Sequence, residues 1–289
     1  MRKEIKEIFP KWCSNMEQGK YTTALTDDLD SLVGCAIEKK VRGNEINYFY
    51  DFNKIYIMDH EDKRKAIGVD LAIHEGKSWC NHVVRIGHDD YINPETANMN
   101  AIYNIHRDNY FKKYAMSTTL TMWSYYNLPL PTTKEGKLLL LAIDSSFLGH
   151  YDERFKEVHN EWLRRLGFSE LIDLLDEFNK KDFFQIIEIY ETKSKISVNK
   201  EGFLTTKLPI DEISKLLELP IELPKGEFLL RNEFEVGTGS SFIVCSKDNL
   251  SLSKKVISFA LVGKNSFKYT YKERKKKSKT AQWLKLIRG

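Results

Sequence analysis

A series of apolar runs, each followed by aspartate, restricts the possible folds of this chain more than any other pattern in it. Three short runs predict β-strands, and a fourth predicts a buried helix or a strand, since a short apolar run does not decide between the two. Strand-like and helical patterns alternate, which favours an α/β fold with a largely parallel sheet and helices on both faces. The runs and the aspartates after them are Tyr21–Thr26 with Asp28 and Asp30, Ile46–Tyr50 with Asp51, Ala66–Val69 with Asp70, and Lys134–Ile143 with Asp144.

The length of 289 residues indicates two domains, because domains cluster around about 100 to 150 residues. We expect an N-terminal parallel-sheet domain over residues 1–150 and a helical connector over 151–199, where three helical patterns occur. A smaller α+β domain over 200–289, ending in a basic tail, completes the chain.

The periodicity of apolar residues predicts further elements. The helices expected in the N-terminal half are Lys3–Met16, despite Pro10, Ser31–Lys40, and a long helical region at Glu95–Asn127. The elements expected in the C-terminal part are a helix at Ile210–Leu219 and strands at Glu227–Val236, Ser241–Cys245, Lys255–Val262 and Phe267–Tyr271.

The composition is that of a chain with a sizeable core, since 42% of the residues are hydrophobic and 30% are charged. The longest apolar stretch, Leu138–Ile143, is far shorter than the roughly 20 residues of a membrane-spanning helix, and the N-terminus does not resemble a signal peptide. The four cysteines have no Cys-x-x-Cys spacing, so neither a zinc site nor a disulfide framework is indicated. We expect a cytoplasmic protein with no membrane partner.

The aspartates that follow the runs predict a metal site. In an open α/β sheet, ligands bind at the carboxyl ends of the strands. Carboxylates gathered there repel one another unless a cation neutralises them, and Mg²⁺ or Mn²⁺ prefers such oxygen ligands. The Asp28-x-Asp30 spacing places two carboxylates on one turn. The alternative is that each aspartate caps a helix or occupies an ordinary turn.

Histidines after Asp70 are candidates for a nitrogen ligand. His82 precedes the apolar pair Val83-Val84, which places it beside a strand, and we favour it over His74. Imidazole combined with carboxylates suits manganese or iron as well as magnesium. The cluster His88-Asp89-Asp90 is a rival whose polarity indicates a loop.

Several segments of Tyr21–His150 resemble motifs of the DHH phosphoesterase superfamily. The first motif, Asp-x-Asp followed by a helix of small residues, resembles Asp28-Leu29-Asp30-Ser31-Leu32-Val33-Gly34-Cys35. The second resembles Gly68-Val69-Asp70, for which Asp51 is a competing candidate, and the name-giving Asp-His-His resembles a degenerate Cys80-Asn81-His82. The fourth resembles Leu140–Ser145, and the segment that holds Lys113 and Ser117-Thr118-Thr119-Leu120 is similar to the family's alanine- and threonine-rich helix.

This resemblance implies a divalent-metal-dependent phosphoesterase that cleaves a phosphodiester or phosphoanhydride, such as a short oligonucleotide or a nucleotide. One or two Mn²⁺ or Mg²⁺ ions would activate water and stabilise charge on the phosphoryl oxygens. Lys113 and Ser117 or Thr118 would contact phosphate, although Lys113 is equally typical of a solvated helix residue. The catalytic metal ligands that the resemblance implies are Asp28, Asp30, Asp70, His82 and Asp144.

Departures from the family pattern leave two alternatives open. Ala24 replaces a histidine that many members carry four residues before Asp-x-Asp, and Cys80-Asn81-His82 keeps one histidine of the pair. These departures favour a catalytically degenerate protein that binds nucleic acid or a nucleotide. The other alternative is a HAD-like phosphatase, in which the first aspartate of Asp-x-Asp is the nucleophile.

Positive charge is concentrated at the C-terminus. The net charge is +4, yet Tyr271–Gly289 alone holds eight lysines or arginines against the single Glu273. The basic run Lys272–Lys279 is a solvated tail, a phosphate-binding arm in which Trp283 stacks on a base, or an element that docks through apolar residues such as Leu284. The expected partner is a nucleotide or a short single-stranded nucleic acid, and a homodimer is left open.

Overall fold

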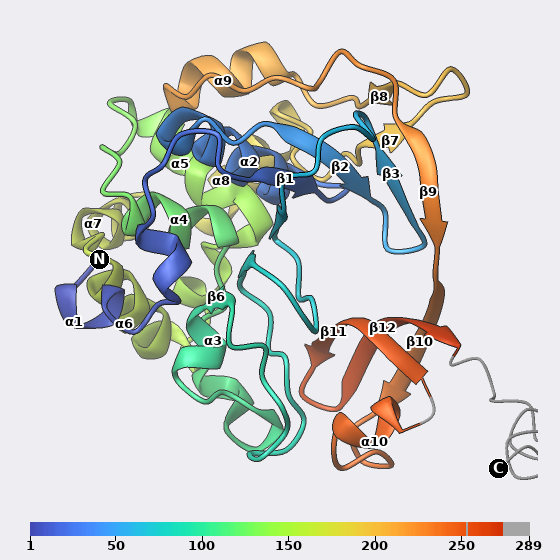
Figure 1. Ribbon diagram of the computed structural model, residues 1–289. Helices are drawn as coiled ribbons and strands as arrows, with labels where there is room; N and C mark the ends of the chain where they lie inside the picture. Colours follow the sequence, from blue (N-terminus) through green and yellow to red (C-terminus); the bar gives the residue numbers. More distant parts are fainter. Residues whose placement is uncertain (253, 274–289) are drawn as a thin grey trace, which may run out of the picture.

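The computed structural model describes residues 1–252 and 254–273 and contains a seven-stranded, mostly parallel sheet (Figure 1). In order across the sheet, the strands are β6 (Thr96–Asn98), β5 (Ser78–Cys80), β4 (Ala66–Val69), β1 (Thr22–Leu25), β2 (Ile46–Tyr50), β3 (Lys54–Ile57) and β9 (Leu229–Glu233). The strands from β6 to β2 are parallel, whereas β3 pairs antiparallel with both β2 and β9. The α/β class predicted from the sequence is confirmed.

The helix that follows β1 is defined by its caps. α2 (Leu29–Arg42) begins after Asp28, whose side chain accepts a hydrogen bond from the backbone N–H of Ser31. It ends at Gly43, which adopts a φ of 63°, a left-handed conformation that glycine tolerates because it lacks a Cβ. The predicted apolar face is buried, and Ile37 is completely enclosed.

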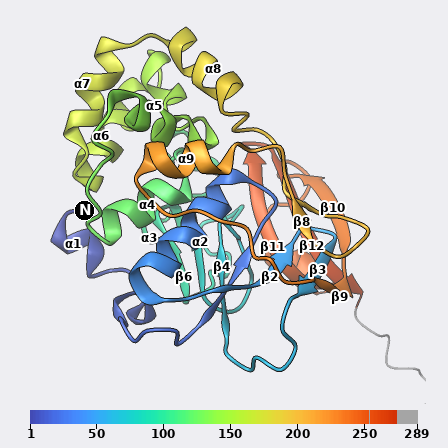
Figure 2. The same cartoon turned by 90° about the horizontal axis from the view of Figure 1, so that it is seen from above.

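Helices cover one face of the sheet. α4 (Thr118–Tyr125) packs on α2, α2 contacts β1 and β4, and α4 contacts β5. Figure 2 shows the two helices side by side over the sheet. Contacts of α4 with α6, and of α5 with α8 and α9, extend this layer, and the three helices predicted between Asp152 and Thr192 are confirmed as α6, α7 and α8. The bounds are α5 (Lys134–Ala142), α6 (Lys156–Leu166), α7 (Ser169–Glu177), α8 (Lys180–Ile189) and α9 (Ile210–Leu217). Among the described residues, no helix has the length and apolarity needed to cross a membrane.

The opposite face of the sheet is covered differently. The side chain of Leu71 lies against Gly68 of β4, where an added Cβ would come within 3.2 Å of it. The same segment joins β11 (Lys254–Gly263), since the backbone N–H of Phe259 donates to the carbonyl of Ala72 at 3.0 Å. Near β2 and β3 the face lines a cavity of about 610 Å³. Helices were predicted on both faces, but the described part of this face carries loop segments, β11 and open surface.

A smaller antiparallel sheet follows β9 along the chain. Its strand order is β10-β12-β11, with β10 at Glu235–Ser240 and β12 at Ser266–Glu273. The strands predicted at Lys255–Val262 and Phe267–Tyr271 are therefore confirmed. β7 (Ser197–Val198) and β8 (Leu204–Thr205) pair with each other and form a separate two-stranded hairpin.

Three predicted elements differ from the structure. Lys3–Met16 is not one helix, because Pro10 adopts an extended backbone between α1 (Lys3–Lys6) and the 3₁₀ turn η1 (Lys11–Ser14). Ser241–Cys245 is a turn and loop instead of a strand, and Ile243 within it is 85% exposed. The region Glu95–Asn127 holds β6 and, besides α4, the short elements α3 (Met99–Ile102) and η2 (Arg107–Lys112).

A buried ion pair fixes α2 to its surroundings. Arg42 donates to both carboxylate oxygens of Glu38, at 2.9 and 2.6 Å, and both side chains are fully buried. The indole N–H of Trp79 and the hydroxyl of Tyr126 also donate to Glu38, at 2.7 and 2.8 Å. Arg42 further donates to the carbonyl of Trp12 at 3.1 Å. These hydrogen bonds offset the loss of hydration that burial imposes on the two charges.

Candidate functional site

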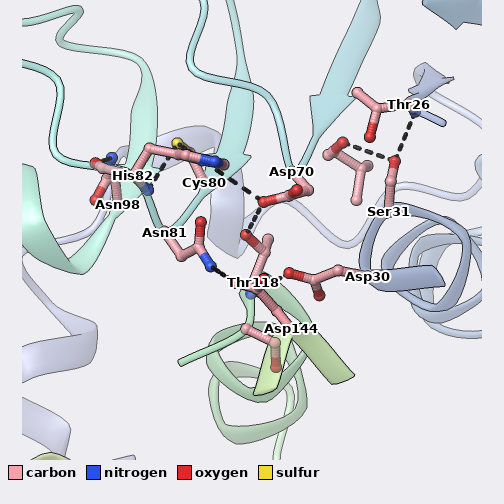
Figure 3. A network of polar contacts seen from close by, with 12 residues as sticks. Thr26, Asp30, Ser31, Asp70, Cys80, Asn81, His82, Asn98, Thr118 and Asp144 are labelled. Atoms are coloured by element: carbon pink, nitrogen blue, oxygen red, sulfur yellow. Dashed lines mark hydrogen bonds and ion pairs between the residues drawn. The ribbon is translucent and has the colours of Figure 1, made fainter. Parts of the chain in front are cut away.

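The carboxyl edge between β1 and β4 is a topological switch point. From β1 the chain passes through α2 to β2 on one side, whereas β4 pairs with β1 on the other side. Ligands of open α/β sheets bind at such points, because the diverging connections leave a crevice there. Asp28 and Asp30 follow β1 and Asp70 follows β4, so the predicted aspartates of these two strands lie at this edge, where Figure 3 shows Asp30 and Asp70.

Asp28 is the partly exposed N-cap of α2 and has a lysine as neighbour. Its Oδ2 lies 3.6 Å from Nζ of Lys195, which also contacts Oδ1 of Asp27 at 3.0 Å. From the same segment after α8, Lys193 donates from Nζ to the hydroxyl of Ser145 at 2.8 Å. The two lysines, which no sequence motif indicated, bring positive charge to the acidic edge.

Asp30 lies in the first turn of α2 and caps a second helix. The backbone N–H of Thr118 donates to its Oδ2 at 2.8 Å, and that of Thr119 donates to its Oδ1 at 2.7 Å. The N-terminus of α4 therefore stabilises this carboxylate. Burial, followed by the charges of Asp70 and Asp144, raises the pKa of Asp30 well above its usual range, and the Thr119 hydrogen bond opposes that rise.

Asp70 is buried and adopts a left-handed backbone conformation after β4, with a φ of 52°. Its Oδ1 accepts a hydrogen bond from the hydroxyl of Thr118 at 2.7 Å and lies 3.7 Å from Nδ1 of His82. Burial raises the pKa of Asp70 well above its usual range, and the charges of Asp28 and Asp144 raise it further. A buried carboxylate with like-charged neighbours is stabilised by a nearby cation.

Asp144 follows a helix, not a strand. It comes after α5, in the 3₁₀ turn η3 (Ile143–Ser145), and both Asp144 and Ser145 have positive φ values, of 50° and 54°. Such backbone conformations cost energy in residues other than glycine and cluster at functional sites. The side-chain amide of Asn81 donates to Oδ2 of Asp144 at 3.1 Å and to the carbonyl of Met116 at 2.7 Å, which orients the carboxylate.

His82 projects from the segment after β5 towards Asp70 (Figure 3). Its Nδ1 lies 3.5 Å from Sγ of Cys80, and its side chain is 36% exposed. Its backbone carbonyl accepts a hydrogen bond from the amide of Asn98 at 2.8 Å. Burial lowers the pKa of His82, but the neighbouring Cys80 and Asp144 outweigh burial, so the net pKa is raised.

The three residues predicted to contact substrate differ in their hydrogen-bond partners and in whether they line a cavity. Ser117 is fully buried and caps α4, since its hydroxyl accepts the N–H of Leu120 at 3.1 Å. The hydroxyl of Thr118 donates a hydrogen bond to Asp70. Lys113 donates from Nζ to the hydroxyl of Tyr110 at 3.1 Å, and it lines a cavity that Asp144 also lines. Of the three, Lys113 is the one placed beside open space.

The rival candidates have local partners that are typical of turns. Asp51 accepts the N–H groups of Asn53 and Lys54 in the β2–β3 hairpin, at 2.9 and 2.6 Å. The ring of His74 lies 4.9 Å from that of Tyr91. In the remaining cluster, His88 pairs with Asp89, and Asp90 accepts the N–H groups of Ile86 and Gly87. These contacts agree with the interpretation of Asp51 as a turn residue, whereas Asp90 in addition accepts hydrogen bonds from the hydroxyl of Ser246 and the backbone N–H of Lys247, which join its loop to a distant segment.

The side chains at this edge that could donate to a metal ion are mainly carboxylates. Within residues 1–252 and 254–273, no group of three or more His, Cys, Asp or Glu side chains lies in an arrangement that could hold a metal ion. Both oxygens of Asp30 are already used by the N-terminus of α4. The carboxylates of Asp28, Asp70 and Asp144 are not held by two N–H groups in this way, and the imidazole of His82 lies beside Asp70, but as placed these side chains do not form a metal-binding group.

Neither a protein-family model, nor a curated protein, nor a solved structure matches this chain. The resemblance to the DHH superfamily stays a prediction based on sequence motifs, and the chemistry of the site is the basis for any functional conclusion.

Proposed function

We propose that this chain is a divalent-metal-dependent phosphoesterase that hydrolyses a phosphodiester or phosphoanhydride in a short oligonucleotide or a nucleotide. The observation that supports the proposal is the repulsion among carboxylates at one sheet edge, which contributes to the raised pKa values of Asp30 and Asp70. A protein that keeps such a cluster loses stability unless a cation neutralises it. Mn²⁺ or Mg²⁺ fits an oxygen-rich site of this kind.

The proposed ligands are Asp28, Asp70 and Asp144, with His82 as a nitrogen ligand or a contact to phosphate. A bound ion supplies Lewis acidity and lowers the pKa of a coordinated water. Asp30 is proposed as a positioning residue, because it ties α2 to α4 and Thr118 of α4 in turn holds Asp70.

The chain's own groups contribute orientation, charge and a proton. Asn81 orients Asp144, and Thr118 orients Asp70. Lys193 and Lys195 attract the phosphate and hold it at the edge of the sheet. Where His82 contacts phosphate and is not a metal ligand, its protonated ring donates a proton to the leaving oxygen.

The test compares Asp144→Asn with Asp51→Asn, because both aspartates follow apolar runs and only Asp144 belongs to the cluster. The purified protein is titrated with Mn²⁺ by calorimetry and assayed against short oligonucleotides, cyclic dinucleotides, 3′-phosphoadenosine phosphate and pyrophosphate. Asp144→Asn should weaken Mn²⁺ binding by more than about tenfold and remove turnover, whereas Asp51→Asn should change neither. Unchanged Mn²⁺ affinity in Asp144→Asn contradicts the site.

A second candidate function is a catalytically degenerate protein that binds nucleic acid or a nucleotide. Two observations favour it: the described donors form no closed site, and Lys195 already lies against Asp28. Mn²⁺ binding without turnover of any phosphoester in the panel would identify this case.

The HAD-like alternative gains one feature from the structure, the lysine next to Asp28. In that mechanism Asp28 is a nucleophile and forms an aspartyl phosphate. Asp28, however, is the N-cap of α2, with one oxygen accepting the N–H of Ser31. Rapid acid quenching with labelled substrate, followed by mass spectrometry of the Asp28 peptide, separates the two mechanisms, because direct attack by water leaves no covalent adduct.

A further inference from the structure

A cavity of about 500 Å³ opens beside Asp144 and Ser145, on the helical side of the acidic edge. Its walls come from η2, from α6 and from η4 (Leu148–Tyr151). The lining includes several aromatic side chains and Lys113. These aromatic residues are Tyr110, Phe111, Tyr151, Phe155 and Trp162. A volume of this size is within the usual range of small-molecule sites, about 300 to 1,000 Å³.

Two phenylalanines expose their rings at this cavity. The ring centroids of Phe111 and Phe155 lie 5.7 Å apart with an interplanar angle of 35°, and Phe111 is 55% exposed. Nζ of Lys264 lies 5.2 Å from the Phe111 ring. The neighbouring rings of Phe111 and Phe155, the first of them 55% exposed, give the cavity an aromatic surface that a flat ligand can cover.

We propose that this cavity binds the nucleobase of the substrate. The inference rests on the proposed function, because Asp144 belongs to both the cavity lining and the acidic cluster. A phosphate at the cluster would therefore place the attached nucleoside at the cavity mouth. Aromatic walls stack well on the flat π-face of any base, and stacking is tolerant of base identity.

The charges of the cavity agree with a nucleotide and disfavour a purely apolar ligand. Lys113 and Lys180 line it together with Asp144 and Asp152. Cationic groups in the lining attract the phosphate of a nucleotide, whereas an acyl chain would leave these charged groups without partners in a buried interface.

The test measures binding of the four nucleoside 5′-monophosphates and of ribose 5-phosphate, each with Mn²⁺, by calorimetry. The wild-type protein should bind each nucleotide more tightly than ribose 5-phosphate. Phe111→Ala should weaken nucleotide binding by about fivefold to more than a hundredfold, the range that base stacking covers, and leave ribose 5-phosphate binding unchanged. Phe155→Leu, which keeps the bulk and removes the π-face, should act in the same direction.

The matched control is Phe203→Ala, since Phe203 is 42% exposed and lies in the β7–β8 hairpin outside the cavity lining. It should change neither affinity. Equal weakening of nucleotide and ribose 5-phosphate in Phe111→Ala, or no weakening of either, overturns the inference, as does equal affinity of the wild-type protein for both ligands.

Failure of this inference and failure of the proposed function have different signatures. If Asp144→Asn removes turnover while Phe111→Ala leaves nucleotide affinity intact, the phosphoesterase proposal stands and the base pocket is wrong. If no phosphoester is hydrolysed but Phe111→Ala selectively weakens nucleotide binding, the pocket stands and the catalytic proposal is wrong.

Discussion

Asp28 and Asp30 are separated by one leucine, and the partners of their carboxylates differ. Asp28 is partly exposed and faces Lys195, whereas Asp30 is buried and accepts the N–H groups of Thr118 and Thr119. From the sequence, both are equivalent members of an Asp-x-Asp pair on one turn. The difference arises from α4, a helix distant in the sequence whose N-terminus docks on Asp30, and no local pattern around Asp30 predicts that contact.

We predict that Asp30→Asn destabilises the fold and that Asp28→Asn does not. The substitution at Asp30 exchanges one acceptor oxygen for an NH₂ group that faces a backbone N–H, and hydrogen bonds to charged groups contribute about 1.5 to 3 kcal/mol. Asparagine at position 28 remains a good N-cap, so its effect should be within about 0.5 kcal/mol. Urea unfolding of the metal-free variants measures both free energies. Equal stabilities would show that Asp30 does not hold α4.

The raised pKa of Asp70 makes the stability of the folded protein depend on pH. Its pKa in the folded protein is raised by burial and by its acidic neighbours, whereas the unfolded value is about 3.9. A folded pKa above the unfolded one means that the folded protein binds more protons in that interval. The associated stability is therefore fully present below about pH 4 and is lost as the pH rises through the raised pKa.

We predict that Asp70→Asn is more stable than the wild-type protein at pH 7 when metal is absent, and of similar stability near pH 4. Each unit of pKa difference corresponds to about 1.4 kcal/mol. Asparagine tolerates the left-handed backbone of Asp70 and can still accept the Thr118 hydrogen bond. Thermal melts from pH 4 to 8 with a chelator provide the measurement. Parallel pH profiles for the two proteins would contradict the raised pKa.

At the scale of elements, the sequence predicted those with strong local signals. The runs before Asp28, Asp51 and Asp70 are strands β1, β2 and β4, because each is apolar, short and ended by polar residues. β5 and β6 are only three residues long, too short for a periodic pattern to be detected. Ser241–Cys245 has strand composition, but the side chains of Phe242 and Ile243 are 72% and 85% exposed, so no packing holds it in a sheet.

The burial of the Glu38–Arg42 pair in α2 could not be predicted from the sequence, because charged residues in a helix are usually exposed to solvent. We predict that Arg42→Met lowers the free energy of unfolding by about 3 to 5 kcal/mol, because Glu38 is left buried without its partner. The double variant Glu38→Gln with Arg42→Met should recover part of that loss.

The control for this prediction is Lys39→Met on the same helix, because Lys39 pairs with Glu222 on the surface and both side chains are well exposed. Its effect should be below about 1 kcal/mol. Urea unfolding compares the three variants with the wild-type protein. A loss in Arg42→Met no larger than in Lys39→Met would mean that the buried pair does not stabilise the fold.

At the scale of the whole molecule, the candidate site is assembled from distant segments. Asp28, Asp70 and Asp144 were predicted because they end apolar runs. Lys193 and Lys195 were missed because lysines in a polar connector carry no signal, and they reach the site only through the packing of α8. The basic tail, including Trp283, lies outside the described residues, apart from Lys272 and Glu273.

The tail yields a prediction from its charge alone. If Lys272–Lys279 contacts a single strand, each neutralised phosphate steepens the dependence of log affinity on log salt by about 0.7. A variant ending at Glu273 should then bind oligonucleotides more weakly and with a shallower salt slope, while its turnover of a dinucleotide stays unchanged. Fluorescence titrations from about 50 to 300 mM KCl measure the slope. An unchanged slope would exclude the phosphate-binding arm.

The pairing of β3 with β9 also determines when the large sheet can be completed during synthesis. Ile57 pairs with Leu229, so the ribosome must add the whole intervening chain first, which takes roughly 10 to 30 s at about 5–20 residues per second. Throughout that interval the nascent chain presents the free edge of β3, and free edges recruit strands of other chains. Protection by chaperones during translation should therefore matter more for the yield of this protein than its final stability would suggest.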